Sequence, residues 1–205
     1  MLNAPYNTSL PKEAMFDARY NNVFAGSMTD WFGRWVPPEW IEVVLQAMRE
    51  NQIWKFLVLT KFPKRMSEFD LPLNMWTGTT IDLQARVANA EAAFAKLADR
   101  YPNGIRWLSI EPLIEQLKFK RLDLFKWIVI GGASKSSRTP AFRPPLPWIM
   151  DLYAQAKAAG CAVYMKTNLL GNRVLELPFD APIKKDPTEA PDVFHYLGRT
   201  RDAER

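Results

Sequence analysis

The chain has 205 residues, of which 48% are hydrophobic and 24% are charged. This is the composition of a packed globular protein, and it excludes a wholly disordered chain. The 27 basic and 22 acidic residues give a net charge of +5, which permits an anionic partner but does not demand one. With one cysteine and no apolar run of about 18 residues, we expect a cytoplasmic protein without membrane contact.

Six short runs of β-branched and aromatic residues predict six strands. They lie at 22–27, 55–60, 74–80, 105–110, 126–132 and 162–167. None of these runs alternates cleanly between polar and apolar residues. Each strand is therefore expected to be covered on both faces, as in a parallel sheet.

Helical patterns separate the predicted strands, at 37–51, 82–104 and 144–160, with a shorter helix at 62–70. In the first of them, the apolar residues that follow a helical period are Trp40, Val43, Val44, Ala47 and Met48. The stretch 112–125 is ambiguous. The β-α order predicts an α/β protein with a parallel sheet and helical crossovers, and both a doubly wound sheet and a (β/α) barrel fit it.

The chain divides into three expected regions. These are an irregular N-terminal arm at 1–20, the sheet domain at 21–172 and a C-terminal extension at 173–205. The extension is rich in proline, which favours an extended conformation over a helix or a central strand.

Polar residues follow the predicted strands at their carboxyl ends, where both kinds of α/β protein bind their ligands. In chain order these residues are Ser27, Asp30, Lys61, Thr80, Glu111, Gly131, Gly132, Ser134, Lys135, Lys166 and Asn168. We take Asp30, Lys61, Glu111 and Lys166 as candidate catalytic residues and the others as candidate ligand-binding residues.

Side-chain alternation aims two of these candidates at the same place. In the fourth strand Glu111 shares a face with Trp107 and Ser109, and in the sixth strand Lys166 shares a face with Tyr164. If helices cover the opposite face, both charged groups point into the mouth of the sheet, where they could bind a polar ligand or transfer protons. The alternative is that they only pair with each other or with the backbone.

The turn after the fifth strand, at 131–135, allows two interpretations. It could expose several backbone N–H groups as a nest for an anion, with the Ser134 hydroxyl and the Lys135 ammonium beside them. It could also be a tight turn in which glycine serves conformation or packing. The pattern matches neither GxGxxG nor a P-loop, so the sequence does not decide between the two.

Four other residues are weaker candidates for a functional site. Cys161, at the start of the sixth strand, is expected to be buried, and a single cysteine makes no metal site. His195 is the one histidine and lies in the proline-rich extension, which argues against Ser-His or Cys-His machinery. Trp31 and Trp35, in the loop after the first strand, could cover a pocket.

Six segments together resemble a phage-associated family of unknown function whose members are sometimes called three-Cys-motif proteins. The segments read VFAGSMTDWFGRWVPPEWIEVVL, FLVLTKFPKRM, MWTGTTIDLQARV, RWLSIEPLIEQL, WIVIGGASKSSRTPAFRPP and QAKAAGCAVYMKTNL. The resemblance implies a (β/α) barrel of the radical S-adenosylmethionine type. In such enzymes three cysteines hold a [4Fe–4S] cluster that binds S-adenosylmethionine.

The chain departs from this family pattern in its cysteines and in its strands. The cysteine segment is missing, and six strands are too few to close an eight-stranded barrel. We therefore expect a partial (β/α) barrel from a truncated chain, which binds no cofactor alone and is not active alone. S-adenosylmethionine and the cluster would need a missing N-terminal segment, and another polypeptide could supply the remaining strands. The resemblance places Glu111 and the turn at 131–134 against cofactor or substrate.

Two further hypotheses stay open. One is a non-redox barrel that binds a phosphorylated or nucleotide ligand at the strand ends. The other is a nucleic-acid or protein-interaction module that uses the net charge and the basic segment 118–126.

Overall fold

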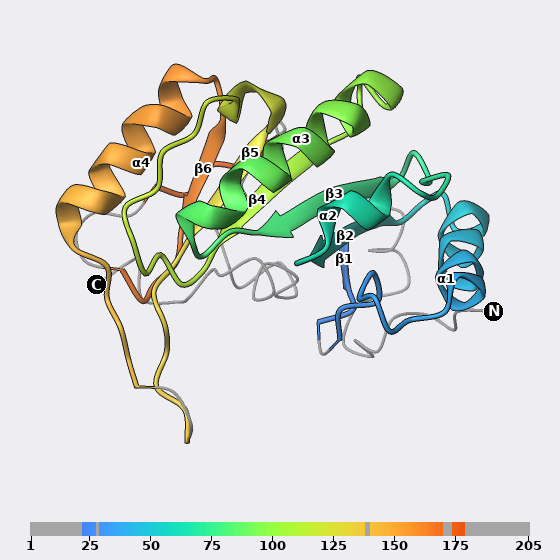
Figure 1. Cartoon of the computed structure of the whole chain (residues 1–205), viewed down its shortest axis with the longest axis horizontal. Coiled ribbons are helices and arrows are strands. Elements are labelled where there is room, and N and C mark those ends of the chain that lie inside the picture. Colours follow the sequence, from blue (N-terminus) through green and yellow to red (C-terminus); the bar gives the residue numbers. More distant parts are fainter. Residues whose placement is uncertain (1–21, 28, 138–139, 170–173, 179–205) are drawn as a thin grey trace, which may run out of the picture.

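The structure, a computed structural model, describes residues 22–27, 29–137, 140–169 and 174–178 (Figure 1). Its elements are β1 (Asn22–Ala25), α1 (Pro38–Glu50), β2 (Lys55–Thr60), α2 (Pro63–Met66), β3 (Met75–Thr80), α3 (Gln84–Arg100), β4 (Arg106–Ile110), η2 (Leu122–Leu124), β5 (Trp127–Ile130), α4 (Leu146–Ala158) and β6 (Ala162–Met165). The predicted arm at 1–20, most of the extension at 173–205 and His195 lie outside the described residues.

All six strands form one parallel sheet in the order β1-β2-β3-β4-β5-β6. Each strand lies beside its neighbour in the sequence, so the order does not reverse as it does in a doubly wound sheet. The sheet curls into half a barrel, with the helices on its outer side (Figure 1). The partial (β/α) barrel that the sequence predicted is therefore confirmed.

Two apolar clusters cover the two faces of the curled sheet. On the outer face, strand residues such as Val58, Leu108 and Val163 pack with the helices in one large cluster. The cluster on the inner face is rich in aromatic side chains and consists of Leu57, Trp76, Trp107, Trp127, Val129 and Tyr164. The alternation predicted for the fourth and sixth strands is confirmed, because Trp107 and Tyr164 lie on the face opposite to Leu108 and Val163.

The helices agree with the sequence analysis except in the orientation of α1. This helix buries Ile41, Leu45 and Met48, whereas Trp40 and Val43 are 66% and 70% exposed. Apolar residues occupy most of its circumference, so its period does not decide which side meets the core. The ambiguous stretch 112–125 is irregular apart from η2. Among the described residues, no helix is long and apolar enough to span a membrane.

Residues 174–178 cover the outer edge of β6 by running antiparallel to it. Glu176 N donates to Val163 O at 2.8 Å, and Met165 N donates to Val174 O at 2.8 Å. Between these two bonds, Leu175 is paired with Tyr164 in an antiparallel bridge. Leu175 and Leu177 pack on the inner cluster. The first residues of the predicted extension thus satisfy an edge that would otherwise present unpaired backbone groups.

Candidate functional site

Glu111 and Lys166 form an ion pair at the carboxyl end of the half barrel, which we call the mouth. Lys166 Nζ lies 2.5 Å from Glu111 Oε2, and the two side chains are 34% and 28% exposed, respectively. Ser109, Val129 and Tyr164 form a row across β4, β5 and β6. Glu111 and Lys166 each lie two residues further along the chain than Ser109 and Tyr164, so the ion pair lies beyond that row on the same face. Two of the candidate residues therefore meet above the inner aromatic cluster, as their alternation predicted.

Gly131 leaves the space through which this pair crosses β5. Glu111 follows β4 and Lys166 follows β6, so the strand between them lies under the pair. A Cβ atom on Gly131 would come within 3.1 Å of both Cγ and Oε1 of Glu111. Glycine is therefore needed at position 131 because it has no side chain, which lets the Glu111 side chain approach the backbone closely. An unusual backbone conformation is not the reason.

The turn after β5 is not an open anion nest, which corrects one of the two interpretations of its sequence. The N–H groups of three successive residues donate within the protein, at 3.0, 2.9 and 2.8 Å: Gly131 to Ile110 O, Gly132 to Asn168 Oδ1 and Ala133 to Phe142 O. Backbone groups that already have partners are not free to hold an anion. The turn is instead packed tightly, because a Cβ on Gly132 would overlap the Phe142 carbonyl oxygen.

Asn168 joins the loops that follow β5 and β6. Its side-chain amide accepts a hydrogen bond from Gly132 N and donates one to Gly132 O at 2.8 Å. Its Nδ2 also lies 3.4 Å from Ser134 Oγ. Asn168 therefore positions the loop, and the side chains of Ser134 and Lys135 are left exposed beside it.

Asp30 is engaged in structural bonds at the same carboxyl end of the sheet, but on the side of β1 and β2. Its Oδ1 accepts from Thr60 Oγ1 at 2.6 Å, and its Oδ2 accepts from Lys61 N at 2.7 Å. These bonds tie the loop after β1 to the end of β2, which lies two strands away from β4 in the sheet order. The structure thus does not bring Asp30, Lys61 or the exposed Ser27 to the ion pair, while Thr80 lies half-buried at the end of β3, beside β4.

The two tryptophans in the loop after β1 differ in exposure. Trp31 is buried in the outer cluster and therefore does not cover a pocket, which was one of the predictions for the two tryptophans. Trp35 is 68% exposed, and its ring meets the ring of Phe62 edge-on at a centroid distance of 5.4 Å.

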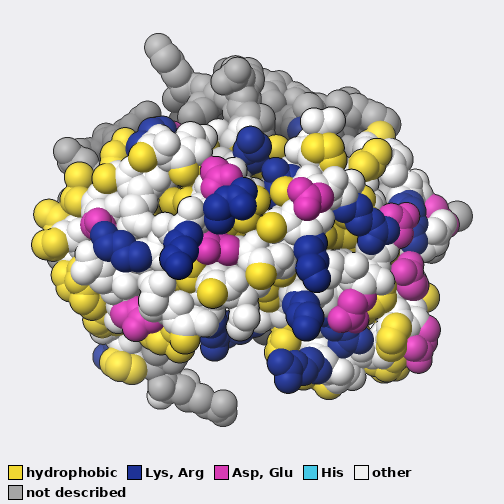
Figure 2. All heavy atoms as spheres, turned by 45° about the horizontal axis from the view of Figure 1, so that its top comes forward, with side chains coloured by type: hydrophobic (Ala, Val, Ile, Leu, Met, Phe, Trp, Pro, Cys, Tyr) yellow, Lys and Arg dark blue, Asp and Glu magenta, His cyan; other side chains and the backbone are white. Residues whose placement is uncertain are grey.

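A broad hollow of about 900 Å³ is lined in part by Phe62, whose ring Trp35 contacts, and this hollow was not predicted from the sequence. Its lining is dominated by five basic side chains and includes one carboxylate, Glu68; the basic residues are Arg34, Lys61, Lys64, Arg65 and Lys96. We call this hollow the basic groove. On the face of the molecule in Figure 2, Lys and Arg side chains are numerous and are interspersed with Asp and Glu side chains. The basic residues come from three separate segments of the sequence, so no local pattern links them. Of the five, Lys61 was the one predicted as a site residue from the sequence.

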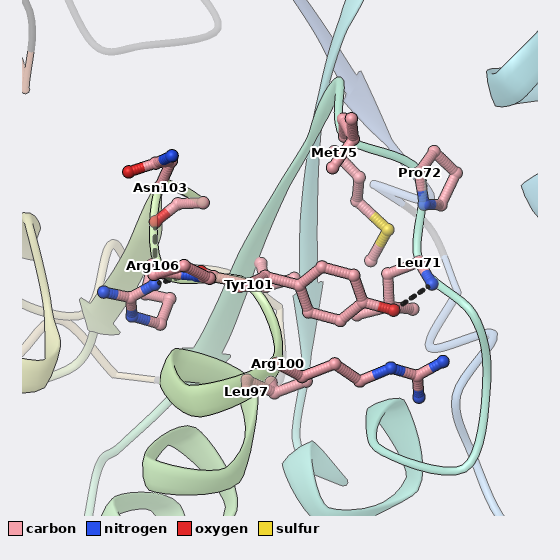
Figure 3. Close-up of a pocket in the computed structure, with 12 residues that line it drawn as sticks. Leu71, Pro72, Met75, Leu97, Arg100, Tyr101, Asn103 and Arg106 are labelled. Atoms are coloured by element: carbon pink, nitrogen blue, oxygen red, sulfur yellow. Dashed lines mark hydrogen bonds between the residues drawn. The ribbon is translucent and has the colours of Figure 1, made fainter.

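A smaller cavity of about 280 Å³ lies at the opposite end of the sheet, where β3 and β4 begin (Figure 3). Tyr101 Oη accepts from Leu71 N at 2.8 Å, and Arg106 Nε donates to Leu124 O at 2.7 Å. Burial raises the pKa of Tyr101 and lowers the pKa of Arg106. Because these two polar side chains serve internal hydrogen bonds at the amino ends of the strands, we assign the cavity to packing.

The basic segment 118–126 is partly neutralised by neighbouring carboxylates. Lys118 Nζ lies 2.6 Å from Asp151 Oδ1, and Arg121 Nη2 lies 3.0 Å from Asp123 Oδ2. The hydrogen bonds from Lys118 and Arg121 lower the pKa of Asp151 and Asp123, respectively. Part of the positive charge of this segment is therefore compensated within the protein.

Comparison with protein families gives one match. The family is described as protein of unknown function (DUF5131), and it matches residues 2–172. The chain belongs to this family. The comparisons with curated proteins and with solved structures returned no match. The matched stretch contains all six strands of the half barrel and every candidate site residue of this DUF5131 protein.

The cysteine content of this DUF5131 chain does not fit a [4Fe–4S] cluster. The chain has one cysteine, Cys161, which is buried at the amino end of β6, where its thiol donates to Phe125 O at 3.2 Å. Burial raises the pKa of this thiol to about 11, whereas cluster ligands are thiolates. The described residues also contain no group of three or more His, Cys, Asp or Glu side chains that could hold a metal ion.

Proposed function

We propose that this DUF5131 protein holds a small phosphorylated ligand, such as a nucleotide, at the mouth of the half barrel. The observation that carries the proposal is the Glu111–Lys166 ion pair, which crosses Gly131 at the carboxyl ends of β4, β5 and β6. Ligands of (β/α) folds bind at this end of the sheet because the loops there vary without disturbing the barrel.

The two charged groups have separate parts in the proposed binding. The Lys166 ammonium is a compact positive charge that suits a phosphate, and the Glu111 carboxylate accepts hydrogen bonds from ligand hydroxyl or amino groups. Without a ligand the two groups satisfy each other at 2.5 Å. Both are partly exposed, so a ligand can exchange for either partner, and the buried aromatic cluster beneath them strengthens the electrostatic interaction.

A second proposal concerns the evolutionary origin of this half barrel. The resemblance of six segments supports a relation to radical S-adenosylmethionine barrels and an association with phages, and the parallel β/α order is compatible with that relation. Since the cysteine content does not fit a cluster, the chemistry that we propose for this chain is non-redox binding by Glu111 and Lys166.

Isothermal titration calorimetry with a small panel of ligands tests the proposal. The panel is inorganic phosphate, ribose 5-phosphate, AMP and S-adenosylmethionine, and the variants are Lys166→Met and Glu111→Gln. A hydrogen bond to a charged group contributes about 1.5–3 kcal/mol, so each variant should weaken binding of ribose 5-phosphate or AMP by roughly 10- to 100-fold. The free energy of unfolding should change by less than about 1 kcal/mol, because the pair is partly exposed.

Lys118→Met is the matched control, because Lys118 also forms a close lysine–carboxylate pair, at 2.6 Å from Asp151. This control should leave ligand affinity unchanged. If S-adenosylmethionine is the one ligand of the panel that binds, the result would support the proposed evolutionary origin and would contradict the proposal of a phosphorylated ligand. The proposal is wrong if no ligand of the panel binds, or if the control weakens binding as much as Lys166→Met.

A further inference from the structure

We infer that the basic groove binds single-stranded nucleic acid, independently of the ligand proposed for the mouth. The groove shares no lining residue with the Glu111–Lys166 pair. Three features carry the inference: basic residues that pair with no carboxylate in the described ranges, aromatic rings at the groove, and an arginine that holds one wall of the groove in place.

The charge of the groove is not cancelled within the described part of the protein. Seven ion pairs join basic and acidic side chains among the described residues, and none of these seven involves Arg34, Lys61, Lys64 or Lys96. Five basic residues and one carboxylate, Glu68, line the groove. Unpaired lysines along a hollow are the arrangement that releases counterions from a phosphate backbone.

Aromatic rings stand at the groove beside these charges. Phe62 belongs to its lining, Trp35 meets the Phe62 ring edge-on, and the guanidinium of Arg34 lies 5.7 Å from the centroid of that ring. Trp35 is 68% exposed, whereas tryptophan is highly buried on average. Exposed aromatic faces next to a basic groove are the device by which proteins stack the bases of single strands.

Arg65 sets the shape of the groove. It extends from α2 to the loop after β1, where its guanidinium donates to Gly33 O and, at 2.5 Å, to Val36 O. These bonds hold the loop that carries Arg34 and Trp35 against α2. Arg65 is therefore a positioning residue, and Arg34, Lys61, Lys64 and Lys96 are the side chains that would meet phosphates.

The combination favours a single strand over a duplex or an acidic protein. A duplex keeps its bases stacked inside and offers no base face to Trp35, whereas a single strand presents phosphates and bases together. An acidic protein would satisfy the lysines but would not require a stacking platform. Duplex and acidic peptide are therefore the competing ligands in the test.

Fluorescence anisotropy with labelled 20-nucleotide oligomers, oligo(dT) and oligo(U), tests the inference on the full chain. We expect binding at 50 mM salt that falls as the salt concentration rises, with a negative slope of log K against log[salt]. The triple variant Lys61→Ala, Lys64→Ala and Lys96→Ala should lose at least about 10-fold in affinity, and the magnitude of its slope should fall by about 2, at about 0.7 per lost phosphate contact. The DNA and RNA arms show whether the 2′-hydroxyl contributes.

A second triple variant controls for net charge. Lys118→Ala, Lys120→Ala and Lys157→Ala remove the same charge from other exposed positions, and this variant should bind nearly as the wild type does. Trp35→Ala should weaken binding by about 5- to 150-fold, the range seen when a stacking ring is removed, and Trp35→Phe should restore part of the loss. Trp40→Ala, which removes an indole of similar exposure from α1 and leaves the Trp35–Phe62 contact in place, should have no effect.

Four results would overturn the inference. They are an absence of binding at 50 mM salt, equal losses in the two triple variants, a duplex or poly-glutamate that binds at least as tightly as the oligomers, and a Trp35→Ala variant with unchanged affinity. Glu111→Gln should leave oligomer binding intact, so the outcome is separate from that of the experiment on the mouth.

Discussion

Two adjacent glycines in the mouth have different physical functions. A Cβ on Gly131 would press on the Glu111 side chain, which is flexible and partly exposed. A Cβ on Gly132 would press on the Phe142 carbonyl oxygen, which belongs to the backbone and is already held by Ala133 N at 2.8 Å. A side chain can turn away at little cost, but a bonded backbone cannot.

The variants Gly131→Ala and Gly132→Ala should therefore separate binding from stability. Gly131→Ala should weaken the ligand affinity of the mouth by about 10-fold while the free energy of unfolding changes by less than about 1 kcal/mol. Gly132→Ala should lower the free energy of unfolding by about 1–3 kcal/mol, the usual cost of overpacking. Urea denaturation measures the second quantity and calorimetry the first. Equal destabilisation by both variants would contradict the assignment of Gly131 to the ion pair.

At the scale of elements, the short segment 174–178 completes β6 through Glu176. One carboxylate oxygen of Glu176 accepts from Val163 N at 2.9 Å, and the carboxylate binds Lys157 Nζ of α4 at 2.9 Å. The carbonyl oxygen of Glu176 accepts from Trp127 Nε1 at 3.0 Å. A single residue thus links the edge of the sheet, a helix and the inner aromatic cluster.

Removal of the Glu176 carboxylate should cost more than removal of an exposed one. Glu176→Ala leaves the Val163 N–H without its side-chain acceptor, and we expect a loss of about 1–3 kcal/mol in the free energy of unfolding. Glu42→Ala is the matched control, because Glu42 forms an exposed pair with Arg49 and should cost less than about 1 kcal/mol. Thermal and urea unfolding followed by circular dichroism compare the two. A smaller loss for Glu176→Ala than for Glu42→Ala would show that 174–178 does not stabilise the edge.

The elements also show what local patterns can predict. Local composition was sufficient for the six strands, the β-α order for their parallel pairing, and the alternation within β4 and within β6 for aiming Glu111 and Lys166 at the same place. The buried side of α1 and the bonded N–H groups after β5 depend on distant partners, such as Asn168, 36 residues from Gly132. The basic groove was missed for the same reason, since its lining comes from three segments.

At the scale of the whole molecule, the half barrel separates three regions with different chemistry. The mouth has one charged pair over an aromatic interior, the amino end has a small packed cavity, and the outer side has a groove with unpaired positive charge. The parallel sheet makes its two ends chemically different, because the carboxyl ends of all its strands lie at the same end of the sheet. The small ligand proposed for the mouth and the nucleic acid proposed for the groove would therefore not compete for the same residues.

The most direct test of the proposed mouth is a titration of the ¹⁵N-labelled protein with ribose 5-phosphate, followed by amide chemical shifts. We expect shifts at Glu111, at 131–134 and at 166–168, with little change at Tyr101 or Arg106 in the packed cavity. The same titration of Lys166→Met should show these shifts only at much higher ligand concentration. Shifts confined to the basic groove or to the packed cavity, or no shifts at millimolar ligand, would contradict the claim that the Glu111–Lys166 pair holds the ligand.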